Sequence, residues 1–152
     1  MELTKEKAKV IYPHVPESFK KELEEAFGKK FFEKKDWKDI KTFEDACKAL
    51  DVDPDAVCSD SDTRDEAAYK KLKVIIQAIN QGWSPDWNNT NQRKWWPWFT
   101  LSSGFGFSVS AYRYGYSGAS VGSRLCFESE SKSDYCARQF LNLYEEFLTI
   151  KN

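Results

Sequence analysis

Histidine is nearly absent from this sequence, and cysteine occurs only at isolated positions. The single histidine, His14, cannot supply a two-histidine metal site. The four cysteines form no C-x-x-C pair, so the sequence supports neither a zinc ribbon nor a thioredoxin-type redox motif. We therefore predict no metal and no cofactor. The thiols are expected to be free and to act as small buried side chains: Cys47, Cys58, Cys126 and Cys136.

Long apolar segments are also lacking. No run approaches the length of a membrane span, and residues 1–10 carry alternating charges without the apolar core of a signal peptide. We therefore expect a cytoplasmic protein with no membrane among its partners.

A strong excess of one charge is the third absence. Lys plus Arg number 23 and Asp plus Glu number 24, which gives a formal net charge of −1. This balance excludes a globally basic nucleic-acid binder and a strongly acidic disordered chain. With 41% hydrophobic and 31% charged residues, the chain suits one globular domain over 1–152. We expect a helical N-terminal part over 1–60, followed by a helix, a β-meander and a helix over 61–152.

Charged and aromatic side chains are nevertheless distributed unevenly. Residues 71–127 contain six basic residues and a single acidic one, Asp86. Half of the 24 aromatic residues lie between positions 83 and 127. The middle of the chain is therefore both basic and aromatic, a combination that suits cation–π contacts and stacking on a ligand.

Local signals predict three helices in the first half of the chain. Thr42 with Asp45, and Thr63 with Glu66, have the spacing of a capping box at a helix N-terminus. Apolar residues at helical spacing follow each of these pairs and also follow Pro16. The predicted helices are 16–27, 42–50 and 64–81.

The second half of the chain carries strand signals. Residues 95–101, 105–112 and 120–128 are rich in aromatic and β-branched side chains and are separated by Gly/Ser clusters, which predicts a three-stranded antiparallel meander. A last helix, capped by Ser131 or Ser133, is expected to reach Ile150. The predicted fold class is therefore α+β, with a small antiparallel sheet of about three strands packed on two long helices and with a helical N-terminal part.

Three word-like motifs point to a family. They are IKTFEDAC over 40–47, NQGWSPDW over 80–87 and VGSRLCF over 121–127. Together they resemble a family of small proteins found in phages, prophages and chromosomes of anaerobic gut bacteria. The resemblance implies a bacterial or phage-related cytoplasmic setting. It brings no activity and no functional residue, because none is assigned to that family.

The strongest candidate site is a cluster of tryptophans. Five of the six tryptophans lie within 16 residues, and adjacent residues of a strand such as Trp95 and Trp96 point to opposite faces. At least one tryptophan is therefore expected outside the core, beside cationic side chains. The candidate ligand-binding residues are Trp83, Trp87, Arg93, Lys94, Trp95, Trp96, Arg113 and Arg124. The alternative is that the tryptophans fill the core and fasten the 83–94 loop to it.

Catalytic signatures are weak. No G-x-S-x-G motif is present, and the glycines between 104 and 122 suit turns better than a phosphate-binding loop. Asp86, His14 or a cysteine would support an enzyme only if a pocket placed it beside Arg124. We assign no catalytic residue and favour a protein that is not an enzyme.

The sequence leaves two binding functions open. The first is a non-catalytic binding protein that uses an aromatic and basic surface, with another protein as the expected partner. The alternative is a protein that binds single-stranded nucleic acid through the same residues. A small enzyme is the third hypothesis, and the oligomeric state is not determined by the sequence.

Overall fold

The computed structural model describes residues 3–33, 36–102, 106–118 and 120–150, with the side chains of 102–112 outside the description. The chain divides into two compact units, Met1–Lys35 and Asp36–Asn152. In the described part of the chain, no helix is long and apolar enough to cross a membrane.

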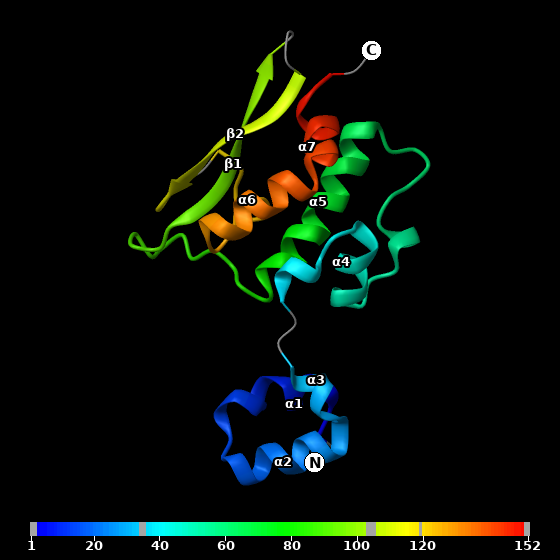
Figure 1. Cartoon of the computed structure of the whole chain (residues 1–152), viewed down its shortest axis with the longest axis vertical. Helices are drawn as coiled ribbons and strands as arrows, with labels where there is room; N and C mark the ends of the chain where they lie inside the picture. Colours follow the sequence, from blue (N-terminus) through cyan, green and yellow to red (C-terminus); the bar gives the residue numbers. More distant parts are fainter. Residues whose placement is uncertain (1–2, 34–35, 103–105, 119, 151–152) are drawn as a thin grey trace. The chain divides into compact units, whose positions relative to one another are not determined.

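The first unit is a small group of helices. It contains α1 (Lys5–Ile11), the 3₁₀ turn η1 (Tyr12–His14), α2 (Glu17–Phe27) and α3 (Lys29–Phe32) (Figure 1). The helix predicted over 16–27 is confirmed as α2, and it ends at Gly28, whose φ of 87° favours glycine. Tyr12 and Phe32 stack with ring centroids 4.1 Å apart. Aromatic contacts therefore supply much of the packing in this unit, where Ala8 and Leu23 are the only buried side chains among the described residues.

The second unit begins with short elements and one long helix. These are η2 (Trp37–Asp39), α4 (Phe43–Leu50), η3 (Pro54–Ala56) and α5 (Arg64–Asn80). Both predicted helix starts are confirmed. The Asp45 N–H donates to Thr42 Oγ1 at 3.1 Å while Asp45 Oδ2 accepts from the Thr42 N–H at 3.0 Å. At α5, the Thr63 N–H donates to Glu66 Oε2 at 2.9 Å.

Helix α5 forms the centre of the core in this unit. Its apolar stripe of Leu72, Ile75, Ile76 and Ile79 is fully buried. It packs against α4 on one side and against α7 (Leu141–Leu148) on another. This stripe recurs at the 3.6-residue period that the sequence shows, so the long helix predicted over 64–81 is confirmed.

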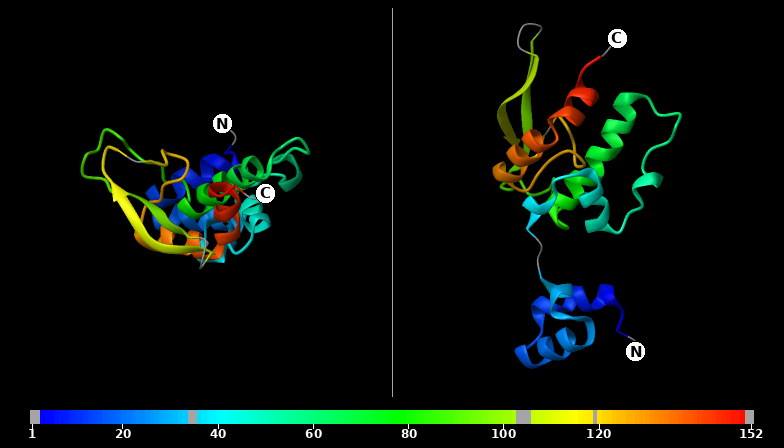
Figure 2. Two further views of the ribbon diagram at one scale, coloured as in Figure 1. Left: turned by 90° about the horizontal axis from the view of Figure 1, so that it is seen from above. Right: turned by 45° about the vertical axis from the view of Figure 1, so that its right-hand side comes forward.

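A two-stranded antiparallel ribbon covers the helices. Strand β1 (Lys94–Ser102) pairs with β2 (Gly106–Gly115), with Lys94 opposite Gly115 and a bulge after Trp98. The predicted start of the second strand, residue 105, lies outside the described residues. In Figures 1 and 2 the ribbon lies on one side of α6 (Glu130–Gln139) and α7, and α4 lies on the far side of α5.

The third strand predicted over 120–128 is not confirmed. Among the described residues of that segment, only Phe127 pairs, exchanging two backbone hydrogen bonds with Trp95 at 3.0 and 2.7 Å. Residues 120–126 form bends and turns, and Gly122 has a φ of 68° that an extended strand does not use. Aromatic content alone therefore overestimated the length of this strand.

The single last helix predicted up to Ile150 is also not confirmed. It is divided into α6 and α7 at Phe140, whose φ of −115° and ψ of 31° are not helical. The N-cap is Ser129, whose hydroxyl accepts from the Lys132 N–H at 3.2 Å, rather than Ser131 or Ser133. The break lets α6 contact the ribbon while α7 packs along α5.

Candidate binding surfaces

The loop between α5 and β1 is fastened to the second unit by its own side chains. Asp86 Oδ1 accepts from the Asn88 N–H at 3.0 Å, and the Asp86 N–H donates to Gln92 Oε1 at 2.7 Å. The Trp87 indole N–H donates to Ser123 Oγ at 2.6 Å. Asp86 therefore caps a turn, and among the described residues it forms no ion pair. Trp87 fastens the 83–94 loop, which is the role that the alternative to a binding surface predicts for it.

Lys94 lies inside the protein and not on the exposed surface that the sequence predicts. Its exposed fraction is 0%. Its ammonium donates to the Asn89 carbonyl oxygen at 3.1 Å and to the Tyr116 carbonyl oxygen at 2.5 Å, and it lies 5.2 Å from the Trp87 ring centroid. Two carbonyl dipoles and an aromatic face thus replace water around the charge. Lys94 joins the start of β1 to two loops and is not available to an external anion.

Trp96 is also interior, with 8% of its surface exposed. Its indole N–H is buried and has no hydrogen-bond partner in the described part of the chain. Trp98, two residues along the same face of β1, is 49% exposed, and the Arg113 guanidinium lies 5.1 Å from its ring centroid. One face of β1 therefore passes from core to surface within three residues.

The opposite face of the ribbon carries what we call the arginine–tyrosine cluster: Arg93, Trp95, Tyr114 and Tyr116. Trp95 and Tyr114 are cross-strand partners, with ring centroids 4.8 Å apart. The Arg93 guanidinium lies 4.7 Å from the Tyr114 centroid, and its Nε donates to the Tyr116 hydroxyl at 3.3 Å. Tyr114 is 46% exposed and Tyr116 is 39% exposed.

Sequence reasoning missed the two tyrosines of this cluster. Tyr114 and Tyr116 flank Gly115 at the end of β2, and their spacing of two residues is the signal that would have placed both rings on one face. Arg93 and Trp95 show the same spacing on the neighbouring segment. The cluster therefore combines two candidate residues from the sequence, Arg93 and Trp95, with two tyrosines that are not among those candidates.

Trp83 and Arg124 line a hollow at a different place, which we call the α5 cleft. This open hollow of about 800 Å³ runs along the exposed side of α5 and is bordered by the 83–85 loop and the 123–124 turn. Lys70, Lys73 and Gln77 line it from the helix. It brings together the second and third word-like motifs of the sequence, which lie about forty residues apart.

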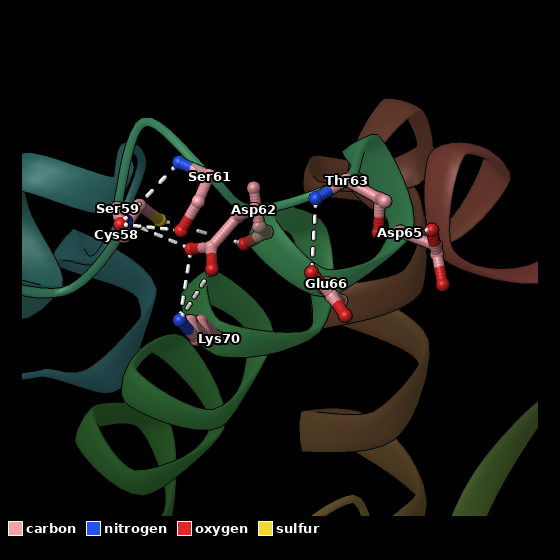
Figure 3. Close-up of polar contacts among 9 residues, drawn as sticks. Cys58, Ser59, Ser61, Asp62, Thr63, Asp65, Glu66 and Lys70 are labelled. Atoms are coloured by element: carbon pink, nitrogen blue, oxygen red, sulfur yellow. Dashed lines mark hydrogen bonds and ion pairs between the residues drawn. The ribbon is translucent and has the colours of Figure 1, made fainter.

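Figure 3 shows how one cation of the cleft is neutralised. The Lys70 ammonium donates to both carboxylate oxygens of Asp62, at 2.7 and 2.8 Å. The Ser59 N–H donates to the same carboxylate at 2.8 Å. The hydrogen bond from Lys70 is the main cause that lowers the pKa of Asp62, and the carboxylate in turn raises the pKa of Lys70.

Among the described residues of the second unit, neither Asp86 nor a cysteine lines the α5 cleft beside Arg124. The described cysteines are free thiols, and burial raises the pKa of Cys126 to about 11 and that of Cys136 to about 12. His14 is exposed and belongs to the first unit, whereas Asp86 and Arg124 belong to the second. No group of three His, Cys, Asp or Glu side chains that could hold a metal occurs among the described residues.

The predicted site residues therefore divide over several places. Arg93 and Trp95 join the arginine–tyrosine cluster, Trp83 and Arg124 line the α5 cleft, Arg113 covers Trp98, Trp87 fastens a loop, and Lys94 and Trp96 are buried.

Comparison with known proteins adds no relative. No family model matches the chain, and searches of curated proteins and of solved structures found no match. The resemblance noted from the sequence motifs therefore stays a prediction.

Proposed function

We propose that this chain is a non-catalytic binding protein that engages another protein through the arginine–tyrosine cluster. The observation that carries this proposal is the exposure of Tyr114 and Tyr116 beside a fixed arginine on the ribbon. Tyrosine, tryptophan and arginine are the residues most enriched at the energetic centres of protein interfaces. Each tyrosine presents a large rigid ring and a polar hydroxyl, which suits an interface that is partly wet.

The side chains of the cluster contact one another in the structure without a partner. The Arg93 guanidinium contacts the ring of Tyr114 and the hydroxyl of Tyr116, and those two rings meet edge to face with centroids 5.9 Å apart. Side chains that are already fixed lose less conformational entropy when they are covered. The arrangement therefore favours recognition of a partner surface with little rearrangement.

A protein partner suits this cluster better than single-stranded nucleic acid. Stacking of bases needs open aromatic faces beside cations that are free to contact phosphates. Here Arg93 lies over the ring of Tyr114, and its Nε is already bonded to Tyr116. The cluster therefore offers fewer open ring faces than a base-stacking platform requires.

The test is affinity capture from a lysate of the cells in which the protein naturally occurs. The capture is done with and without nuclease, using the wild-type protein and the Tyr114→Ala/Tyr116→Ala double variant. Phe19→Ala provides the matched control, because Phe19 is an exposed aromatic residue (38%) in the first unit. We expect a protein that is enriched by wild type and by Phe19→Ala, is lost with the double variant and is unaffected by nuclease. When the captured protein is purified and titrated with each form of the chain, wild type and Phe19→Ala should bind it more tightly than the double variant does.

Two outcomes would overturn the proposal. One is that no captured protein depends on the two tyrosines. The other is that nuclease, or a modest rise in salt, removes the captured material, which would favour the nucleic-acid hypothesis because counterion release makes such binding strongly salt-dependent.

A further inference from the structure

The walls of the α5 cleft are tied to each other by two hydrogen bonds, one buried and one partly buried. The Asn80 side-chain amide donates to the Cys126 carbonyl oxygen at 3.0 Å, and its oxygen accepts from the Glu128 N–H at 3.3 Å. These bonds join the end of α5 to the chain that follows the 123–124 turn. The cleft is therefore present without a ligand, as is usual for sites that bind small molecules.

Each wall positions one functional side chain. After α5, Gly82 has a φ of 86°, and the Trp83 N–H donates to the Asn80 carbonyl oxygen at 3.0 Å, which directs Trp83 into the lining. On the other wall, Ser123 receives the hydrogen bond from Trp87 and thereby fixes the residue before Arg124. A flat indole and a guanidinium thus line the same hollow.

The cleft carries uncompensated positive charge. Its charged lining residues are Lys70, Lys73 and Arg124, and no acidic side chain lines it among the described residues. Lys70 is neutralised by Asp62, but Lys73 lies over the ring of Tyr69, 5.0 Å from the centroid, and forms no ion pair with a described residue. Arg124 is exposed and has no partner in the described part of the chain. A negatively charged ligand would therefore balance the positive charge of Lys73 and Arg124.

Size and chemistry restrict that ligand further. The volume of about 800 Å³ lies within the range of small-molecule sites. The planar donor fork of arginine matches the oxygens of a phosphate, and the half-buried Trp83 offers an aromatic surface for a planar ring. An anion that combines a phosphate with a planar ring uses both features at once.

We propose that the α5 cleft binds a nucleotide, either free or as one unit of a single strand. Its phosphate contacts Arg124 and Lys73, and its base stacks on Trp83. This site is separate from the arginine–tyrosine cluster, and the proposal does not rest on the function proposed for that cluster.

The test is calorimetric titration of the whole chain with adenosine 5′-monophosphate, adenosine, inorganic phosphate and a short oligodeoxythymidylate. Two matched pairs of variants locate the site: Arg124→Gln against Arg113→Gln, and Trp83→Leu against Trp98→Leu. Thermal unfolding of each variant confirms that it is folded. We expect the mononucleotide to bind, with at least a tenfold loss of affinity in the two cleft variants and less than a twofold change in the two ribbon variants.

The ligands separate the two possible sources of the nucleotide. An oligonucleotide that binds at least tenfold more tightly than the mononucleotide indicates a single strand, and similar affinities indicate a free nucleotide. The proposal is overturned if neither binds at millimolar concentration, or if the ribbon variants lose as much affinity as the cleft variants. It is also overturned if inorganic phosphate binds as tightly as the mononucleotide, since the planar ring then contributes nothing.

Discussion

Asn80 is the residue whose replacement tests the architecture most directly. It is 6% exposed, and its side chain bridges to the Cys126 carbonyl and the Glu128 N–H, 46 and 48 residues further along the chain. In Asn80→Ala both bonds are lost. The Glu128 N–H can turn to water because Glu128 is exposed, but the Cys126 carbonyl is left buried and unpaired.

The expected loss of stability depends on what happens to the Glu128 N–H and to the Cys126 carbonyl oxygen after the substitution. A lost hydrogen bond whose partner is resolvated costs about 1 kcal/mol, and a buried unpaired carbonyl costs about 1–3 kcal/mol. We therefore expect Asn80→Ala to lower the free energy of unfolding by about 2–4 kcal/mol. For a chain of this size that corresponds to a fall in melting temperature of about 4–16 °C.

The measurement is urea unfolding followed by circular dichroism, with Gln77→Ala as the matched control. Gln77 has the same amide group one turn earlier on α5, is exposed and makes no side-chain hydrogen bond in the described structure. Its replacement should change stability by less than about 0.5 kcal/mol. Asn80→Asp should be at least as destabilising as Asn80→Ala, because a carboxylate would face the Cys126 carbonyl. If Asn80→Ala and Gln77→Ala have the same free energy of unfolding, the two hydrogen bonds of Asn80 do not stabilise the fold and the reasoning is refuted.

Three further predictions concern cysteine reactivity, pH and packing. At pH 8 iodoacetamide should modify Cys58 alone in the folded protein, as read by mass spectrometry, because burial keeps the other thiols protonated and covered: Cys47, Cys126 and Cys136. The lowered pKa of Asp62 means that its ion pair stabilises the fold above pH 3.8, the usual value, and that this contribution is lost as pH falls further. The stability difference between wild type and Asp62→Asn should therefore be constant from pH 5 to 8 and vanish in acid, and a difference that persisted at pH 2 would contradict the assignment. Phe127→Ala should cost about 3–5 kcal/mol in urea unfolding, since Phe127 is 0% exposed; a loss under 1 kcal/mol would place it outside the core.

Helix starts could be predicted from the sequence because their determinants are local. The bonds between Thr42 and Asp45 connect residues three positions apart, and the same spacing marks the start of α5. The break at Phe140 could not be predicted in this way. Apolar residues continue at helical spacing across it, and the break reflects where α6 and α7 find their different packing partners.

The third strand and the burial of Lys94 depend on distant residues. A segment rich in β-formers becomes a strand only where a neighbour pairs with it, and at 120–128 only Phe127 finds that neighbour in the described structure. Lysine is almost never fully buried, so sequence reasoning places it at the surface. Lys94 is an exception because the Tyr116 carbonyl oxygen, 22 residues away, accepts a hydrogen bond from its ammonium.

The sequence predicts that the tryptophans form either a core or a binding surface, whereas on the two-stranded ribbon they do both. An isolated two-stranded ribbon is only marginally stable. Its large side chains therefore have to pack against the helices, even where they also form a surface that a partner could bind. Trp95 shows both roles, since it packs against the core of the second unit and also carries Tyr114 and Arg93 on its outer side. Trp96 is interior and Trp98 is half exposed although both lie on one face of β1. A substitution at Trp95 would therefore lower stability and binding together, whereas Tyr114 can be changed to test binding with a smaller effect on the core.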